Sequence, residues 1–567
     1  MALICAAAVA TTLFAGCGST GAEQTGNNAG STVTEAAQGK DSVGGGNAAQ
    51  SVAGTADTVI VVMSPSSEPA AGFNPCINWG CGEHCHEPLI QSTLIRTNVD
   101  MEFENDLATD YSVSEDGRTW TFHIRDDVKF TDGEPLTASD VAFTFNTALA
   151  TPNSEADLSM LDSVEALDDT TVIFHMSKPY NAFLYTLAVF GIVPEHCYDE
   201  AAYGENPVGS GRYILTQWDK GQQVVLEANP DYYGDEVQMK KVIVLFMEED
   251  AALAAVKAGQ VDIAYTSAVY SDEQVDGYQL LVCKSVDSRG ISLPSIPAGN
   301  EVVDGDTVYA AGNDVICDVA LRQAMNYALD RQTMIDHVLN GYGEVAYSVS
   351  DNMPWSSESM IIPYDVDKAE QILADGGWSD TDGDGIVEKD GQKAEFTVYY
   401  SASDSVRQAL TAEFSNQMKA VGINVLYEGL GSWDELYTKM YSDPITWGWG
   451  SNSPVEDYQL YYTGGSCNFT GYSNEKTDEL LDAALAATDM NESYSLWQQA
   501  QEDVGRLRKI HDAYYVHRLS KRHKVLLHPH MCFLVNRKTK VSVPANCHYR
   551  NLAWVRWPMP GLYNFSC

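Results

Sequence analysis

The stretch Val128-Lys-Phe-Thr-Asp-Gly-Glu-Pro-Leu-Thr-Ala-Ser-Asp-Val-Ala-Phe-Thr-Phe145 predicts the order of the elements around it. Its segment 131–135, Thr-Asp-Gly-Glu-Pro, has the composition of a turn. Thr137 followed three residues later by Asp140 is an N-cap pattern, so we expect a helix over 138–150. Upstream, residues 119–125 alternate as an amphipathic strand does. A strand, a turn and a capped helix therefore follow one another.

Working outward, the apolar periodicity predicts further strands and helices. Residues 58–63 are β-branched and apolar, which indicates a buried strand. A strand at 423–427 comes directly after a helix that Gly422 ends. Helix followed by strand at this spacing favours α/β lobes in which helices cover sheets. The predicted helices of the second half span residues 319–340, 367–375, 405–421, 476–487 and 494–504.

The length and the net charge of the chain limit the classes of protein to which it can belong. A chain of 567 residues suggests about three lobes with cores of their own. With 34 Lys and Arg against 79 Asp and Glu, the net charge of −45 repels nucleic acid and anionic membranes. We therefore expect no nucleic-acid partner and a ligand that is neutral, zwitterionic or cationic.

The amino terminus has the pattern of an exported lipoprotein. Residues 2–16 are uncharged and apolar and are too short to span a membrane as an ordinary helix does. They end in Leu-Phe-Ala-Gly-Cys17, which resembles the bacterial lipobox, although Lys40 is the first basic residue. The Gly- and Ala-rich residues that follow have the composition of a flexible tether. We expect Cys17 to be lipidated and the protein to be extracytoplasmic and anchored to the cell membrane by lipid alone.

Several segments resemble the family 5 extracellular solute-binding proteins of bacterial ABC importers, which carry peptides, nickel complexes and similar solutes. Residues 128–145 resemble the signature of that family. The other matching segments, in the family's order, are Asn206–Tyr213, Asn229–Gly234, Ala254–Ile263, Leu321–Arg331, Val338–Gly343 and Gln417–Asn424. The resemblance implies a two-lobed, periplasmic-binding-protein-like α/β fold with a subdomain inserted in the first lobe. It also implies a solute held between the lobes and an importer permease as partner, and we expect a monomer.

This resemblance divides the chain into consecutive parts. We expect a signal peptide at 1–16, a lipidated tether at 17–57, the first lobe at 58–96 and 206–295, an inserted subdomain at 97–205, the second lobe at 296–488, a return to the first lobe at 489–505, and a basic tail at 506–567.

The tail differs in composition from everything before it. Residues 506–567 hold 12 Lys and Arg but one acid, and nothing in them matches the family. Two interpretations are a polyanion-binding tail and an out-of-frame end. Because the like charges repel one another, we expect this stretch to form no packed part of the first lobe.

The candidate ligand-binding residues lie after the last predicted strand of the second lobe. Trp447 and Trp449 offer flat apolar surface and one donor each, although paired tryptophans are also common in cores. Peptide-binding relatives resemble W-x-x-D-x-x-D-P here, whereas this chain has Gly450 and Asn452 at the positions of the first Asp. We therefore favour a partly cationic or chelate-type solute. The candidates are Trp447, Trp449, Ser451, Asn452, Ser453, Trp79 and Trp355.

Two segments have the composition of metal sites. Residues 76–87 gather three Cys, two His and two Glu, among which Cys81, His84, Cys85 and His86 are candidate ligands for a transition metal, with disulfides as the alternative. Residues 380–388 begin like a calcium loop, but Gly391 takes the place of the bidentate Glu, so a solvated hairpin is the other interpretation.

No hydrolase elbow, phosphate loop or H-E-x-x-H motif occurs in the chain. We therefore expect a binding protein without enzymatic activity that requires no cofactor. If a transition metal or metal chelate is bound, we expect it to be the ligand that the protein carries. The alternatives are a secreted metal-dependent enzyme that uses the 76–87 cluster and a chemosensory binding receptor.

Overall fold

The computed structural model describes residues 57–69, 72–77, 88–98, 102–151, 154, 158, 160–282, 287–304, 307–450 and 453–506, with two further strands at 512–517 and 532–536. The chain divides into two units, residues 1–50 and 51–567, and everything described below belongs to the second. Cys17, the signal peptide and most of the predicted tether and tail lie outside the described residues.

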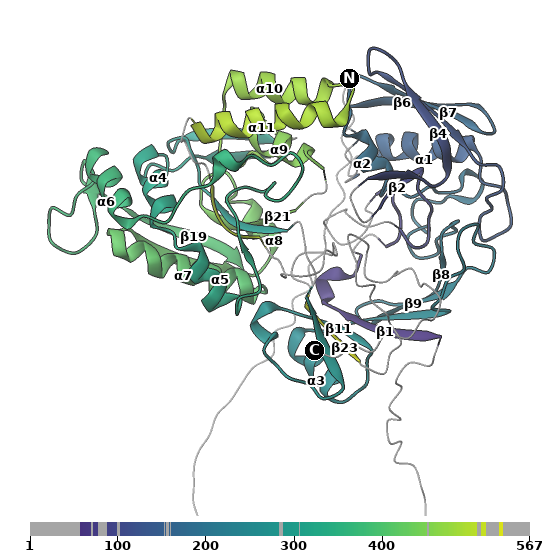
Figure 1. Cartoon of the computed structure of the whole chain (residues 1–567), viewed down its shortest axis with the longest axis horizontal. Helices are drawn as coiled ribbons and strands as arrows, with labels where there is room; N and C mark the ends of the chain where they lie inside the picture. The colour runs from purple at the N-terminus through teal and green to yellow at the C-terminus, as the bar shows by residue number, and fades with distance from the viewer. Residues whose placement is uncertain are drawn as a thin grey trace, which may run out of the picture. The chain divides into compact units, whose positions relative to one another are not determined.

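A seven-stranded mixed sheet forms the first lobe (Figure 1). Its strand β1 is the strand predicted over 58–63, and both of its faces are covered: Val59 belongs to one core cluster, and Ile60 and Val62 to another that includes Val256 of helix α3. In order across the sheet the strands are β12 (Tyr278–Val282), β23 (Cys532–Asn536), β11 (Ile263–Thr266), β1 (Thr58–Met63), β10 (Lys241–Phe246), β9 (Gln223–Ala228) and β8 (Tyr213–Asp219), and α3 spans Glu249–Lys257.

The inserted subdomain is a four-stranded antiparallel sheet packed against α1 (Ala138–Ala150). The predicted cap is present, because the backbone N–H of Thr137 donates to Asp140 Oδ2 at 2.8 Å. The helix predicted over 138–150 is therefore confirmed. The other elements of this part are β2 (Ile95–Thr97), β3 (Phe103–Asn105), β4 (Ala108–Val113), β5 (Thr119–Ile124), β6 (Leu161–Asp168), β7 (Thr171–Met176) and α2 (Phe183–Leu187).

A six-stranded sheet forms the second lobe. In order its strands are β16 (Glu344–Val345), β22 (Asp512–His517), β13 (Ser288–Ser292), β21 (Ile445–Trp449), β19 (Glu395–Ser401) and β20 (Asn424–Leu430). Its helices and hairpins are α4 (Val319–Ala328), α5 (Arg331–Val338), α6 (Val366–Asp375), α7 (Ser405–Met418), α8 (Trp433–Tyr437), β14–β15 (Asn300–Asp304 and Thr307–Ala311) and β17–β18 (Glu388–Lys389 and Gln392–Lys393). The sheet already includes residue 288, before residue 296 where we expected the second lobe to begin.

The prediction of one long helix over 319–340 is wrong. Residues 319–328 and 331–338 form two helices, because the side chain of Asp330 accepts a hydrogen bond from the Thr333 N–H at 3.0 Å and starts a second helix. A residue that caps a new helix interrupts the old one without disturbing the apolar spacing on which the prediction rests.

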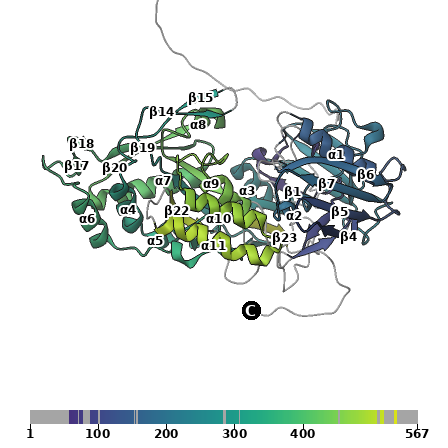
Figure 2. The same cartoon turned by 90° about the horizontal axis from the view of Figure 1, so that it is seen from above.

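Helices α9 (Val455–Tyr461), α10 (Glu475–Ala486) and α11 (Met490–Arg506) pack together, and α10 and α11 run side by side in both Figure 1 and Figure 2. Leu481 and Trp497 belong to the same core cluster as Phe145 of the inserted subdomain. The amide of Asn181 also donates to the carbonyl oxygens of Ala484 and Ala487, each at 2.9 Å. Residues 489–505, where we expected the chain to return to the first lobe, thus include helix α11, which shares this core cluster with the inserted subdomain.

The expectation that residues 506–567 form no packed part of the first lobe is wrong for β23. Its backbone pairs with both β11 and β12, and β22 pairs with β13 and β16 in the other sheet. The net charge of the stretch conceals two short apolar runs, Ala513–Val516 and Cys532–Val535. Backbone pairing depends on such local runs and not on the mean composition. The chain therefore passes between the two sheets twice, after β12 and again after β22.

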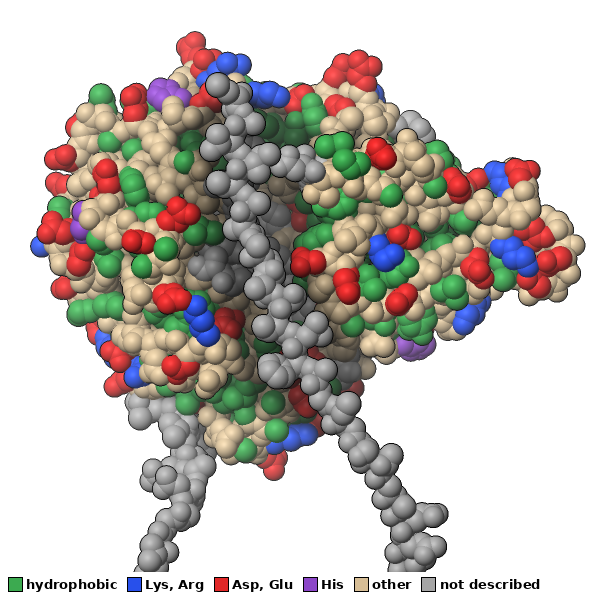
Figure 3. Space-filling model, turned by 180° about the vertical axis from the view of Figure 1, so that it is seen from behind, with side chains coloured by type: hydrophobic (Ala, Val, Ile, Leu, Met, Phe, Trp, Pro, Cys, Tyr) green, Lys and Arg blue, Asp and Glu red, His purple; other side chains and the backbone are tan. Residues whose placement is uncertain are grey.

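Among the described residues, no helix is long and apolar enough to cross a membrane. Figure 3 shows acidic side chains scattered over one face of the molecule, with fewer basic ones between them.

Candidate functional site

Two buried arginines meet above a glycine in the second-lobe sheet. Arg289 on β13 is the register partner of Gly448 on β21, and Arg407 lies in the first turn of α7. A Cβ at Gly448 would stand 2.0 Å from Arg289 Nη1 and 2.9 Å from Arg407 Nη2. A larger residue at this position would therefore have to displace the guanidinium groups from where they lie.

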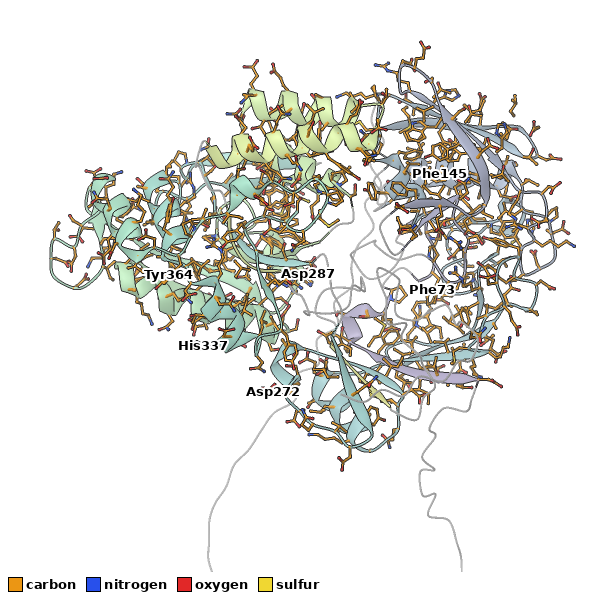
Figure 4. The ribbon with its side chains drawn as sticks, in the orientation of Figure 1. Phe73, Phe145, Asp272, Asp287, His337 and Tyr364 are labelled. Atoms are coloured by element: carbon orange, nitrogen blue, oxygen red, sulfur yellow. The ribbon has the colours of Figure 1, made fainter. Side chains whose placement is uncertain are left out.

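Each arginine has its own carboxylate. Arg289 Nη1 is paired with Asp287 Oδ1 and donates to the carbonyl of Ser288 at 3.1 Å. Arg407 Nη1 donates to Asp404 Oδ2 at 2.6 Å. Figure 4 labels Asp287 beside the six-stranded sheet. The cluster as a whole contains two positive and two negative charges and is electrically balanced.

Asp404 is tied to the helix as well as to the arginines. Its Oδ1 accepts the backbone N–H groups of Val406 at 3.0 Å and Arg407 at 2.9 Å, so it is the N-cap of α7. Burial by itself raises the pKa of a carboxyl, but the charges of Arg407 and Arg289 and the two backbone donors outweigh it and lower the pKa of Asp404. The carboxylate is thus ionised and holds Arg407 in place.

An aromatic wall continues from this cluster toward the solvent. The Arg407 guanidinium lies 5.1 Å from the ring centroid of Trp433, which is 40% exposed, and Tyr437 next to it is 43% exposed. The ring centroids of both are about 6 Å from that of Trp447, with interplanar angles of 15° and 23°. Trp433 and Tyr437 therefore present flat apolar surface beside buried charges, an arrangement suited to stacking on a small molecule.

The predicted tryptophans have different roles. Trp447 is 5% exposed and its indole N–H donates to Ser292 Oγ at 2.9 Å, so it supports the wall from inside the core. Trp449 is half-buried, with its ring centroid 5.9 Å from that of Phe469. Ser453 begins the turn into α9, where its Oγ accepts the Val455 N–H at 3.3 Å. Ser451, Asn452 and Trp79 lie outside the described residues.

Trp355 is a packing residue rather than part of this wall. It is 1% exposed, and its ring contacts those of Tyr185 and Tyr494 in the largest core cluster. Its indole N–H donates to Ser350 Oγ at 3.2 Å, and that hydroxyl donates to Asp457 Oδ1 at 2.9 Å. Asp457, one of the nearest acids to the tryptophan pair, is thus engaged in a buried network.

The 76–87 cluster is described only at its first residue and at Ile77. Cys76 is a buried free thiol that donates to the carbonyl of Thr144 at 3.6 Å, and burial raises its pKa to about 12. This thiol packs in the core as an apolar group does. Cys81, His84, Cys85 and His86 lie outside the described residues, so their metal or disulfide role stays a prediction.

The segment at 380–388 leads into the hairpin β17–β18, which confirms the hairpin interpretation. Asp380, Asp382 and Asp384 do converge, but Lys393 Nζ lies among them, paired with Asp384 and 3.0 Å from Asp382 Oδ2. An ammonium group of the chain itself thus occupies the position of a cation.

Arg289, Arg407 and Trp433 are absent from the predicted site. A signal for Arg289 exists in the sequence, because a charged residue inside the short strand Ser288–Ser292 must be paired when the strand is buried. For Arg407 the signal is the Asp404 cap three residues before it. Neither signal says that the two side chains meet, since that depends on the pairing of β13 with β21.

Comparisons with known proteins agree with this architecture. The family model described as bacterial extracellular solute-binding proteins, family 5 middle, matches residues 102–471. Protein XP55 of Streptomyces lividans is 33% identical over 496 residues, covering 84% of this chain and 85% of that protein. The oligopeptide-binding protein AppA of Bacillus subtilis is 27% identical over 446 residues, covering 74% and 79%. The crystal structure of NikZ from Campylobacter jejuni in complex with Ni(L-His) superposes with a TM-score of 0.70 at 24% identity, covering 85% of this chain and 94% of that one.

Proposed function

Because the chain belongs to family 5 of the bacterial extracellular solute-binding proteins, we propose that it captures a small solute bearing a carboxylate, either a short peptide or an amino-acid chelate of nickel, for an ABC importer. The observation that carries the proposal is the pair of buried arginines, Arg289 and Arg407, beside the exposed ring of Trp433.

The charges of the cluster favour this solute class. A guanidinium presents a fork of donors that matches a carboxylate, and the hydrogen bonds between the two groups are stronger away from water. Since Asp287 and Asp404 lie in the same cluster, a solute with both an ammonium and a carboxylate group meets an opposite charge for each. The net charge of the chain predicts a neutral, zwitterionic or cationic ligand, and the arginine pair adds a requirement for a carboxylate.

The relatives support the same two candidates. AppA is named an oligopeptide-binding protein, and the NikZ structure contains Ni(L-His). Peptides and histidine both carry a carboxylate and amino or imidazole nitrogen. The departure from the W-x-x-D-x-x-D-P pattern favours the chelate over a peptide that requires its free ammonium group.

The remaining features of the proposal follow from the amino-terminal pattern and from the family. The protein acts outside the cytoplasm, anchored through Cys17, as a monomer that hands an unchanged solute to the permease. A chemically altered solute after incubation would instead support the metal-dependent enzyme.

Calorimetry on the purified full chain tests the site with two ligands, a dipeptide and a nickel–histidine chelate. Arg407→Gln should weaken binding of the preferred solute by at least ~10-fold, because a charge-assisted hydrogen bond contributes about 1.5–3 kcal/mol. Trp433→Ala, at an exposed ring, should weaken it without changing the fold.

A matched control is Arg125→Gln. Arg125 also pairs with an aspartate, Asp127, and also lies over an aromatic ring, that of Tyr233 at 4.6 Å, but belongs to the inserted subdomain. Equal losses in the Arg125 and Arg407 variants, or no loss in either, would show that the arginine cluster is not the binding site.

A further inference from the structure

A histidine, a cysteine and an aspartate converge on the inserted subdomain, away from the arginine cluster. The ligating atoms of Asp132, His196 and Cys197 all lie within 4.8 Å of one another, and all three residues are exposed. Asp132 Oδ2 is 2.7 Å from His196 Nε2 and 3.9 Å from Cys197 Sγ. One carboxylate oxygen therefore faces both an imidazole and a thiol.

Backbone hydrogen bonds fix the conformation of the turn that carries Asp132. The Asp132 Oδ1 atom accepts the backbone N–H of Glu134 at 3.2 Å, which leaves Oδ2 directed at the other two side chains. The N–H of Thr131 donates to the carbonyl of Gly209, and the N–H of Phe130 donates to the carbonyl of Glu134, each at 2.9 Å. The carboxylate is thus oriented by the loop that precedes α1.

The other two residues lie on a short 3₁₀ helix, Glu195–Cys197, that is tied to the start of α1. The N–H of Glu195 donates to Asp140 Oδ1 at 2.9 Å, and Ser139 Oγ donates to Glu195 Oε2 at 2.6 Å. The ring of His196 has its centroid 6.0 Å from that of the buried Phe130. Two segments far apart in the sequence therefore present their ligands to the same point.

We propose that Asp132, His196 and Cys197 form a Zn²⁺ site with water as the fourth ligand. Imidazole nitrogen, thiolate sulfur and carboxylate oxygen are the ligands zinc takes in proteins, and a soft thiolate disfavours calcium and magnesium. Zinc–ligand bonds of about 2.0–2.3 Å in a tetrahedron place the ligand atoms about 3.3–3.8 Å apart.

The site reaches this geometry with small movements. The Asp132–Cys197 separation is already close to the required value, and the Asp132–His196 hydrogen bond opens by less than about 1 Å. On binding, His196 presents an unprotonated Nε2 to the metal and carries its one ring proton on Nδ1, and the Cys197 thiol releases its proton to solvent. The ion then clamps the turn at 131–134 to the 3₁₀ helix and stabilises the subdomain independently of solute binding.

Cobalt is the probe, because a cobalt–thiolate bond absorbs in the near ultraviolet and four-coordinate cobalt absorbs in the visible. The full-length protein, reduced and freed of metal, is titrated with Co²⁺ and then with Zn²⁺. The starting protein carries Cys81→Ser and Cys85→Ser, so that the segment 76–87 supplies no competing pair of thiolates. In this background the thiolate band should appear, should be lost when Zn²⁺ displaces Co²⁺, and should be absent when Cys197→Ser is added. His196→Gln and Asp132→Asn should each weaken Zn²⁺ binding by ~10-fold or more.

A control variant separates this site from the other cysteines. Cys317→Ser removes a half-exposed free thiol near Asp314 and Asp318, which belongs to no metal-ligating cluster among the residues that the structure describes, and should keep the band. A band that survives Cys197→Ser in the Cys81→Ser/Cys85→Ser background, or Zn²⁺ affinity unchanged in His196→Gln, would overturn the proposal and leave Asp132 and His196 as an ordinary surface pair.

Discussion

Replacing Asp457 with asparagine should change how the stability of the protein depends on pH. Asp457 is 1% exposed and accepts hydrogen bonds from Ser350 Oγ at 2.9 Å and Gln501 Nε2 at 2.7 Å. These two donors lower the pKa of the carboxyl, but burial outweighs them, and the nearby charge of Asp351 adds to it. The result is a pKa raised from 3.8 to about 7.

The sign of the effect follows from the two pKa values. Between about pH 4 and pH 7 the folded chain holds a proton on Asp457 that the unfolded chain has already lost, so rising pH favours unfolding. One pKa unit corresponds to about 1.36 kcal/mol, so this group lowers the free energy of unfolding by about 4 kcal/mol across that interval. Above pH 7 both states are ionised and the contribution is constant.

Asparagine fits the same network without titrating. Its carbonyl oxygen can accept from Gln501, and its amide can donate to Ser350 Oγ, which already accepts from the Trp355 indole at 3.2 Å. Denaturant unfolding of both proteins between about pH 4 and pH 8 gives the difference in unfolding free energy at each pH. The wild type should lose stability relative to Asp457→Asn as pH rises to 7.

The exposed Asp168 is a control of opposite sign. Hydrogen bonds from Thr170 and Thr171 lower its pKa below 3.8, so in the pH range below 3.8 the wild type should gain stability relative to Asp168→Asn as pH rises, whereas between pH 4 and pH 8 the difference between the two should stay constant. A difference between wild type and Asp457→Asn that does not vary with pH would refute the reasoning, because it would mean that the carboxyl ionises alike in the folded and unfolded chains.

Four further substitutions test other parts of the protein. Gly448→Ala should displace the buried Arg289 guanidinium, lower the free energy of unfolding by about 1–3 kcal/mol and weaken solute binding measured by calorimetry. If the unfolding free energy and the affinity were both unchanged, the guanidinium would move freely. Trp447→Phe should lower the free energy of unfolding by about 1 kcal/mol, because the hydrogen bond to Ser292 is lost. Trp449→Ala should weaken solute binding by about 1–2 kcal/mol, and an unaltered affinity would place Trp449 in the core. Cys17→Ser should release the protein from the membrane to the medium, and identical fractionation of both forms would contradict lipidation.

Local patterns predicted the elements whose limits are determined within a few residues. The helix at 138–150 could be read from the sequence because its cap, Thr137 and Asp140, lies in the same turn. The same logic failed at Asp330, where a second cap divides a continuous apolar periodicity. Mean composition failed for the tail, because β23 needs only five residues of the right character.

The sequence by itself determined the family, the α/β character and the approximate limits of several elements, because these depend on short-range periodicity, caps and motifs. Only the tertiary structure decided that Arg289 and Arg407 share the space above Gly448, that Trp447 is core, and that Asp132 meets His196 and Cys197. These pairings depend on strand register and on packing between distant segments. A side chain's burial and partners are properties of the neighbours that the fold brings to it, and the local sequence does not contain them.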